Sequence, residues 1–170
     1  MLAIGDTVLR VVNMVFLVIA LGLTGSLAAT TIFQLNSEVN FAVFACAFGL
    51  LTSTFYGVLA YFFEIFAWPI VLALLDFLNT VFTFAAATAI AAVIRAHSCS
   101  NEDYVMNNSI TQGSKGRCRK AQASTAFLYF SFFVFLASSV FSIAAIAQGG
   151  LFTPAGRKTS RVGVPSASQV

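Results

Sequence analysis

The sequence predicts an all-α fold, a four-helix transmembrane bundle in which neighbouring helices are antiparallel. Of the 170 residues, 59% are hydrophobic and 9% are charged, and the mean hydropathy is +0.90. No Lys or Arg occurs between Arg10 and Arg95. A bilayer core about 30 Å thick needs roughly 20 apolar residues of helix. The apolar runs that reach this length are residues 11–33, 41–63, 68–94 and 121–147.

These runs are continuously apolar rather than alternating, which distinguishes helices from the strands of a closed barrel. Both architectures satisfy backbone hydrogen bonds inside lipid, but a barrel strand alternates between lipid-facing and inward-facing residues. The composition leaves too few charged residues for a soluble surface. We therefore predict helices that cross the bilayer.

The first run has an alternative interpretation as a cleaved signal peptide. Arg10, the apolar stretch after it and the small residues Ser26 and Ala28 fit that pattern. Asp6 weakens the positively charged leader, however, and the apolar character continues through Phe33. We interpret residues 11–33 as a retained first span.

The connections between the runs are short, except for one. A polar turn covers residues 34–40, and Pro69 suits the first turn of the third helix, where its missing N–H has no intrahelical partner. The longer connection covers residues 95–120. We predict one domain at residues 1–148 and a flexible tail, rich in Gly, Ser and Pro, at residues 149–170.

Four antiparallel crossings return both termini to the same side of the membrane, but the basic residues do not identify that side. The side of the termini holds four of them and the long loop holds five. The first group is Arg10, Arg157, Lys158 and Arg161, and the second is Arg95, Lys115, Arg117, Arg119 and Lys120.

The cysteines favour an extracellular loop. Cys99 and Cys118 lie near opposite ends of the loop, and a disulfide between them would close it with a gain of about 3 kcal/mol from chain entropy. Such a bond requires an oxidising compartment, so we predict that the loop is extracellular and both termini are cytosolic. The alternative is two unpaired thiols in a reducing loop. The sequence Asn107-Asn108-Ser109 is a glycosylation sequon in the same loop.

Enzyme and metal signatures are absent from the sequence. His97 is the single histidine and no C-x-x-C pair occurs, which disfavours zinc and excludes an HExxH motif. No G-x-S-x-G elbow and no phosphate-binding loop is present. We predict that the protein is not an enzyme, holds no metal or cofactor and binds no nucleic acid.

Asp76 is an acid in the middle of the third apolar run, WPIVLALLDFLNTVFTF. Such a carboxylate normally faces the interior of the bundle and marks a functional position. Because no basic residue falls within any run, we expect Asp76 to have no ion-pair partner in the spans and to be protonated or hydrogen-bonded. The predicted intramembrane polar cluster comprises Asn13, Tyr56, Asp76 and Asn79, with Thr83 on the same helical stripe as Asp76 and Asn79.

Two roles compete for this cluster. One is conduction of protons or solutes, for which intramembrane carboxylates are common relays. The other is adhesion between helices, where each hydrogen bond contributes about 0.6 kcal/mol. Because a single acid without successors makes a poor relay, we favour adhesion. Small residues spaced four apart also predict close helix approaches, at Gly22 with Ser26, Ala45 with Gly49, and Ser138 with Ser142.

The tail carries a second candidate site. Its basic residues would each gain about 1 kcal/mol near anionic headgroups, and phosphate on the hydroxyl residues between them would oppose that attraction. An inert solvated tail is the alternative. The predicted lipid-binding and regulatory residues are Arg157, Lys158, Thr159, Ser160 and Arg161.

Several segments together resemble the fungal non-classical export protein family, a four-span group of MARVEL-domain proteins. They are LRVVNMVFLVIALGL, NFAVFACAFG, AWPIVLALLDFLNTVFTF, IRAHSCSN, ITQGSKGRCRKAQASTAFLYFS and RVGVPSASQV, which together extend over nearly the whole chain.

This resemblance implies a multi-pass plasma-membrane protein with cytosolic termini, located in the furrow-like microdomains of eisosomes. It implies a role in organising lipids and nutrient transporters, a response to sphingolipid status, and a link to secretion of proteins that lack signal peptides. Expected partners are membrane lipids such as sphingolipid or sterol, further copies of the chain, eisosome scaffold proteins and nutrient transporters.

From the residues and the resemblance together we expect a non-enzymatic organiser of membrane microdomains. The alternative is a small transporter or channel, or an accessory subunit of a transporter. A channel would need polar groups at successive depths, but segments such as AAATAIAAVI are almost wholly apolar.

Overall fold

The computed structural model describes residues 4–32, 36–56, 69–95 and 97–149, and within these ranges it is helical without strands. Its elements are α1 (Ile4–Ala29), α2 (Ser37–Gly49), the π-helix η1 (Leu50–Tyr56), α4 (Pro69–Ile94), α5 (Glu102–Asn107) and α6 (Lys115–Gly149).

Four helical segments are long and apolar enough to cross a membrane, which confirms the predicted all-α, four-span fold class. These segments are Gly5–Ala29, Ser37–Thr54, Ile70–Ile94 and Lys115–Ala144.

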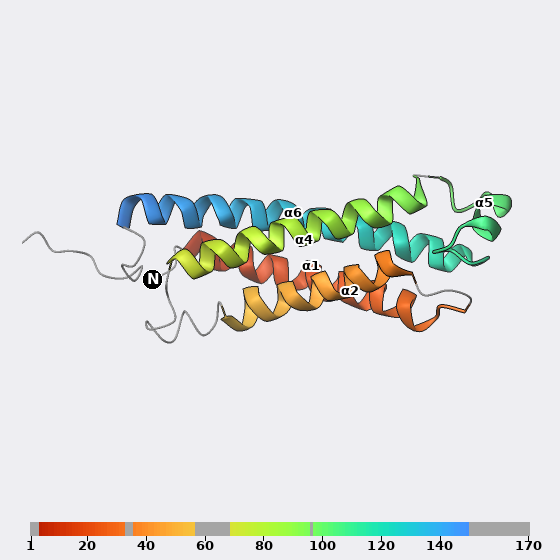
Figure 1. Cartoon of the computed structure of the whole chain (residues 1–170), viewed down its shortest axis with the longest axis horizontal. Coiled ribbons are helices and arrows are strands. Elements are labelled where there is room, and N and C mark those ends of the chain that lie inside the picture. The colour runs from red at the N-terminus through yellow and green to blue at the C-terminus, as the bar shows by residue number, and fades with distance from the viewer. Residues whose placement is uncertain (1–3, 33–35, 57–68, 96, 150–170) are drawn as a thin grey trace, which may run out of the picture.

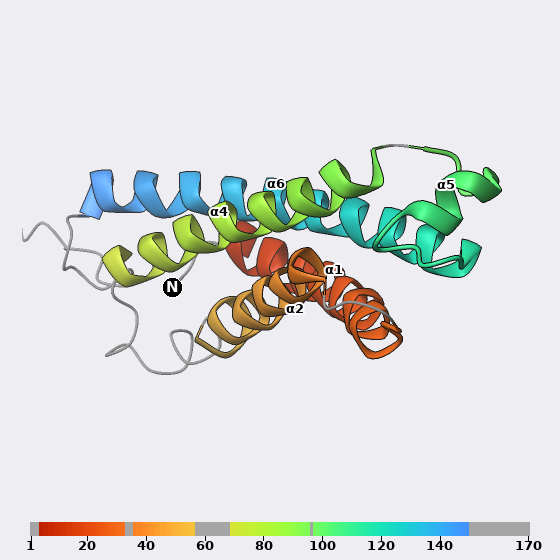
Figure 2. The same ribbon diagram turned by 45° about the vertical axis from the view of Figure 1, so that its right-hand side comes forward.

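The four long helices form an elongated antiparallel bundle (Figure 1). α1 and α4 run in one direction, and α2 and α6 return in the other, so the start of α1 and the end of α6 lie at the same end of the bundle. α6 packs along both α4 and α1, while α2 packs against α1 and α4. These contacts arrange the four helices in a ring, in which α1 and α4 lie diagonally opposite each other across the core. Figure 2 shows α2 crossing α1 on the side away from α6.

Three helices begin earlier than the hydropathy predicts. α1 begins at Ile4 rather than at residue 11, α2 at Ser37 rather than at residue 41, and α6 at Lys115 rather than at residue 121. In each case the added turns contain charged side chains, which lower the hydropathy without interrupting the helix. Arg10 is paired with Asp6 one turn away. The consequence is that Arg10 belongs to the first spanning helix.

The second span changes its winding before it ends. α2 continues from Gly49 directly into η1, a π-helix over Leu50–Tyr56. The predicted end of this span at residue 63 lies outside the described residues. Pi-helical segments are rare and occur often at functional sites. Here the segment lies at the end of the bundle that also holds the start of α1.

The long loop is ordered by local caps. Arg95 follows α4 with φ 50°, a left-handed conformation that ends the helix. Asn101 caps α5 by accepting a hydrogen bond from the backbone N–H of Tyr104. Gly113, with φ 80°, turns the chain into α6. The loop predicted at residues 95–120 therefore contains a short helix and the first turns of α6.

The core differs between the two ends of the bundle. Toward the loop end, the buried cluster is apolar and includes Ala20, Leu27, Ala86, Ile90 and Leu128. Toward the end that holds the start of α1, the buried side chains are mostly polar. They include Asp6, Arg10, Asn13, Ser53, Asp76, Asn79, Thr80, Ser138 and Ser139.

Candidate functional site

A buried ion pair joins α1 to α4 across the bundle. Arg10 Nη2 lies 2.9 Å from Asp76 Oδ2 and Arg10 Nη1 lies 3.2 Å from Asp76 Oδ1, so the guanidinium and the carboxylate meet through two hydrogen bonds. Arg10 Nε also donates to Asp6 Oδ2 at 2.9 Å. Ser142 on α6 donates to Asp76 Oδ2 at 3.0 Å. Three of the four spans therefore meet at Asp76.

The prediction that Asp76 has no ion-pair partner in the spans is wrong. It rested on a first helix that begins at residue 11, whereas α1 begins at Ile4 and carries Arg10 into the core. The side chain of Asp76 is 1% exposed and that of Arg10 is 8% exposed, so both charges are buried. The charge on Arg10 lies next to Asp76 because the two helices start at the same end of the bundle.

The paired geometry offsets part of the cost of removing two charges from water. A fork of two parallel N–H···O bonds matches the guanidinium to the carboxylate and adds geometric specificity. A buried pair of this kind is weak support for net stability, but separating it leaves an isolated charge in the core. The pair therefore sets the register of α1 against α4.

Two other members of the predicted polar cluster, Asn79 and Asn13, lie one helical turn from this pair. Asn79 follows Asp76 by one turn on α4 and donates to Thr52 Oγ1 at 2.7 Å. Asn13 follows Arg10 by one turn on α1 and is 1% exposed. Tyr56 is the last residue of η1. The structure thus adds Arg10, Asp6 and Ser142 to the predicted set.

One close approach involves the predicted small-residue pair of Ala45 and Gly49, both of which are buried. A Cβ atom on Gly49 would lie 3.0 Å from Leu17 Cδ1 and 3.5 Å from Asn79 Oδ1. The absence of a side chain at residue 49 therefore lets α1, α2 and α4 meet. Gly22, by contrast, would carry a Cβ without any close neighbour among the described residues.

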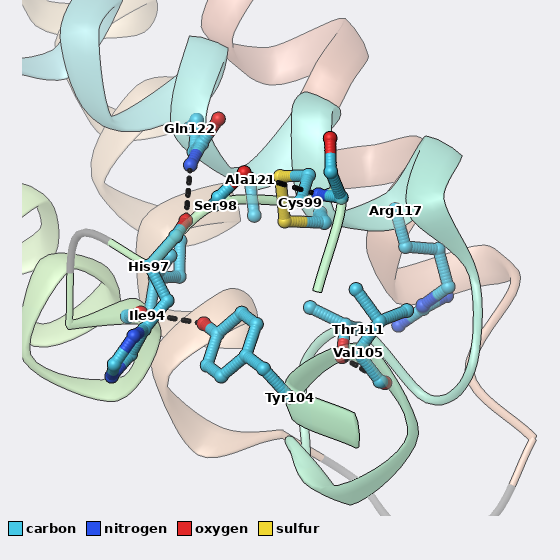
Figure 3. Close-up of a disulfide and its surroundings, with 12 residues drawn as sticks. Ile94, His97, Ser98, Cys99, Tyr104, Val105, Thr111, Arg117, Ala121 and Gln122 are labelled. Atoms are coloured by element: carbon cyan, nitrogen blue, oxygen red, sulfur yellow. Dashed lines mark hydrogen bonds between the residues drawn. A yellow bond between two sulfur atoms is a disulfide. The ribbon is translucent and has the colours of Figure 1, made fainter. Parts of the chain in front are cut away.

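A second ordered site lies at the loop end, where Cys99 and Cys118 form a disulfide with their Cα atoms 5.7 Å apart (Figure 3). The bond joins the segment after α4 to the first turns of α6. Gln122 supports the same junction by donating to the carbonyl oxygen of His97 at 3.0 Å. Tyr104 reaches back from α5 and donates to the carbonyl oxygen of Ile94.

Arg117, next to Cys118, is a structural residue, although its place in the sequence predicts only one of the charges of the loop. It is 6% exposed. Its guanidinium donates to the carbonyl oxygens of Ile110 at 2.9 Å and Leu27 at 3.0 Å, and to the Thr30 hydroxyl. Leu27 lies in the last turn of α1, where a cation also interacts favourably with the helix dipole. Residues 117 and 118 thus tie α6 to α1 and to the loop after α4.

In the sequence Arg117 is one of several basic residues in the long loop, and no local pattern marks it as the buried one. Its neighbours have different environments: Arg119 is exposed, and Lys120 donates to the Ser26 hydroxyl at 2.7 Å. Only the packing of α6 on the end of α1 separates the buried residue from the exposed one.

Asn107, the predicted glycosylation residue, is exposed at the end of α5. Its Nδ2 donates to the carbonyl oxygen of Asp103 at 2.9 Å. The next residue, Asn108, is part of the loop structure and donates to the carbonyl oxygen of Val93 at 2.8 Å. Glycosylation of Asn107 stays a prediction.

The remaining site predictions concern the tail and metals. The five tail residues from Arg157 to Arg161 lie outside the described residues. Gly149, the first residue of the predicted tail, is the last residue of α6, and the rest of the tail lies outside the described residues. Within the described ranges, no group of three or more His, Cys, Asp or Glu side chains is placed to hold a metal ion.

The outward faces of the long helices carry large apolar side chains. They come from all four spans, so the bundle presents a largely apolar surface around its circumference, while Asp6, Arg10 and Asp76 are paired inside. Examples at least half exposed are Val11, Val18, Phe44, Leu51, Leu74, Phe77, Phe130, Phe133, Val140 and Ile143.

Comparison with known proteins gives consistent matches over the whole chain. The profile of the MARVEL family, described as a membrane-associating domain, matches residues 2–141. The chain is 70% identical to Non-classical export protein 102 of Candida albicans and 52% identical to Non-classical export protein 2 of Saccharomyces cerevisiae. It is 44% identical to Non-classical export protein 2 homolog 1 of Saccharomyces cerevisiae. Each alignment covers 100% of both chains. No solved structure matches.

Proposed function

Because this chain belongs to the MARVEL family of membrane-associating domains, we propose that it is a non-enzymatic organiser of plasma-membrane microdomains. It is a multi-pass membrane protein with four spans. Its relatives carry the name non-classical export protein. We propose that this chain takes part in the export of proteins that lack signal peptides. The proposed location is the eisosome furrow, with a response to sphingolipid status.

The observation that carries this proposal is the distribution of polarity in the bundle. The interior of the bundle buries Asp6, Arg10, Asn13, Asp76 and Asn79, while Phe, Leu, Ile and Val side chains face outward from each span. A surface of this kind contacts acyl chains and other spanning helices rather than a soluble substrate. Organisation through lipids, through further copies of the chain and through transporters is the activity that such a surface supports.

The experiment uses a fungal strain that lacks its own copies of these export proteins and expresses this chain with a fluorescent tag. We expect the tagged protein in stable surface patches that coincide with eisosome markers, and we expect restored release of a reporter without a signal peptide. Inhibition of sphingolipid synthesis should redistribute the patches. An even distribution over the surface, together with unchanged reporter release, would contradict the proposal.

The proposed orientation places both termini in the cytosol and the disulfide-bearing loop outside. Protease added to intact cells should leave a tag on the tail uncut and should reach the loop. A tag on the tail that is removed from intact cells would reverse the orientation.

A transporter or channel remains the competing class, supported by the buried acid at residue 76. The apolar core at the loop end, with Leu27, Ile90 and Leu128 at 0% exposure, argues against a continuous polar path. Flux measurements on reconstituted vesicles test this directly. Solute or proton flux that is lost on Asp76→Asn would favour the transporter.

A further inference from the structure

Two asparagines in the bundle interior carry amide atoms that have no hydrogen-bond partner among the described residues. Both side-chain atoms of Asn13, Nδ2 and Oδ1, are buried and unpartnered, and so is Oδ1 of Asn79. Asn13 is 1% exposed and Asn79 is 0% exposed. Buried polar atoms in folded proteins are almost always hydrogen-bonded to protein or to ordered water. These three atoms therefore require partners.

The two asparagines face the same part of the interior. Asn13 lies one helical turn from Arg10, and Asn79 lies one turn from Asp76, the two residues that are hydrogen-bonded across the bundle. One further turn along α1, Leu17 meets Gly49 beside Asn79 Oδ1. Along α1, Asn13 thus lies between the Arg10–Asp76 ion pair and the contact of Leu17 with Gly49.

The second span also borders this part of the interior, and near Asn79 it is a π-helix rather than an α-helix. Thr52, which accepts the hydrogen bond from Asn79 Nδ2, lies in the π-helix η1. Its hydroxyl already donates to the carbonyl oxygen of Phe48 at 2.7 Å. Thr52 is therefore fully used and offers no donor to Asn79 Oδ1. The widened winding of a π-helix is often retained where a site needs it.

We propose that ordered water occupies this part of the interior, hydrogen-bonded to the amides of Asn13 and Asn79. Two donor hydrogens on Asn13 Nδ2 and the two carbonyl oxygens supply the two to four partners that an internal water needs. The water extends toward the end of the bundle that holds the start of α1. It stops before the apolar side chains of Ala20, Ile90 and Leu128. The buried hydroxyl of Ser131, one turn along α6 from Leu128, is also unpartnered among the described residues, but one hydroxyl is fewer than the two to four partners that an internal water needs.

This site has a physical consequence for the ion pair. Water beside Asp76 and Arg10 raises the local dielectric constant, which lowers the cost of burying their charges. The bundle is then hydrated at one end and dry at the other, so the internal water does not form a path across the membrane.

The test measures magnetisation transfer from water to protein by solid-state NMR, on the full chain in lipid bilayers. We expect fast transfer to the side-chain amides of Asn13 and Asn79 and slow transfer to the Ile90 and Leu128 methyl groups. Transfer to Asn13 and Asn79 no faster than to Ile90 would overturn the proposal. Equally fast transfer to Ile90 would overturn the dry boundary. This measurement needs no variant, so it does not depend on the folding of one.

The variant Asn13→Leu gives an independent readout, because both amide atoms of Asn13 are unpartnered among the described residues. If water bridges the amides, the replacement leaves that water and Asn79 Oδ1 without a hydrogen-bond partner, and the melting temperature falls. If the interior is dry, the replacement removes an unpartnered polar group and the melting temperature rises, which would overturn the proposal. Thr24→Val is the matched control in the dry half, because the Thr24 hydroxyl is already satisfied by the Ala20 carbonyl oxygen at 2.8 Å.

Discussion

Arg10 on α1 donates hydrogen bonds of 3.2 and 2.9 Å to the carboxylate of Asp76 on α4. The two helices lie diagonally in the bundle, so this pair crosses the core rather than joining neighbours. Ser142 adds α6 to the same carboxylate. Because α1 and α6 both bind the carboxylate of Asp76 on α4, a single substitution at Asp76 tests the packing of three spans.

Replacing Asp76 by Ala should destabilise the bundle strongly, because it leaves the Arg10 guanidinium buried with Asp6 as its remaining acid among the described residues. We expect a loss of about 3 kcal/mol in the free energy of unfolding. The double variant Arg10→Met, Asp76→Leu should recover most of that loss, since it removes both charges. Unfolding in lipid nanodiscs measures both, with the exposed Asp103→Asn as the control. A double variant less stable than Asp76→Ala would contradict this account.

Arg117→Gln should destabilise the loop end, whereas Arg119→Gln should not. Arg117 caps the carbonyl oxygens of Leu27 and Ile110, and hydrogen bonds to charged groups contribute about 1.5–3 kcal/mol. Arg119 is exposed two residues away and carries the same charge. The melting temperatures of the two variants make a matched comparison, and equal shifts would exclude a capping role for Arg117.

Loss of the disulfide through Cys99→Ser should lower the free energy of unfolding by about 3 kcal/mol, because the bond joins two cysteines with a sequence separation of 19 and closes the loop between them. The protein should also migrate differently on gels with and without reductant, and the variant should not. Cys46→Ser is the control, since Cys46 is a free buried thiol. If Cys46→Ser removed the reductant-dependent shift, the pairing would be different.

Gly49→Leu should disrupt the contact of α1, α2 and α4, while Gly22→Leu should be tolerated. A Cβ at residue 49 already lies 3.0 Å from Leu17 Cδ1, and overpacking of this kind costs about 1–3 kcal/mol. At residue 22 a Cβ meets no described atom within 4 Å. Thermal unfolding of the two variants compares them directly. Equal stability would mean that the close approach at Gly49 is not required.

The loop supplies a pH prediction. Lys115 Nζ lies 2.9 Å from Glu102 Oε1, and this hydrogen bond together with the positive charge holds the pKa of Glu102 below its ordinary value. A carboxyl with a lowered pKa in the folded state stabilises the fold above its unfolded pKa, and that contribution is lost as the pH falls through the folded pKa. Both side chains are exposed, so the effect on stability is small.

Substituting Lys115 by Gln should raise the pKa of Glu102 toward its ordinary value. An NMR titration of the carboxyl carbon measures this shift, with Asp103 as an internal reference in the same helix. An unchanged titration of Glu102 would show that Lys115 does not pair with it in solution.

Much of the fold followed from the sequence because hydropathy and helix length are properties of single segments. The four apolar runs, the short connections and the turn at Pro69 each report on their own stretch of chain. The start of α1 was misplaced because Arg10 ended the apolar run, although the charge was compensated by Asp6 and Asp76. A hydropathy value treats each charged residue by itself, so it does not register that the charge of Arg10 is paired in the folded bundle.

The amino-acid sequence by itself determined that this chain folds into four lipid-embedded helices, because apolar side chains of sufficient number can be buried only in a bilayer. The tertiary structure decided which polar groups meet: Arg10 with Asp76, Arg117 with the end of α1, and Gly49 with Leu17. These pairings depend on which helix faces lie opposite each other. That arrangement arises only when the helices pack together, and a pattern along one segment does not contain it.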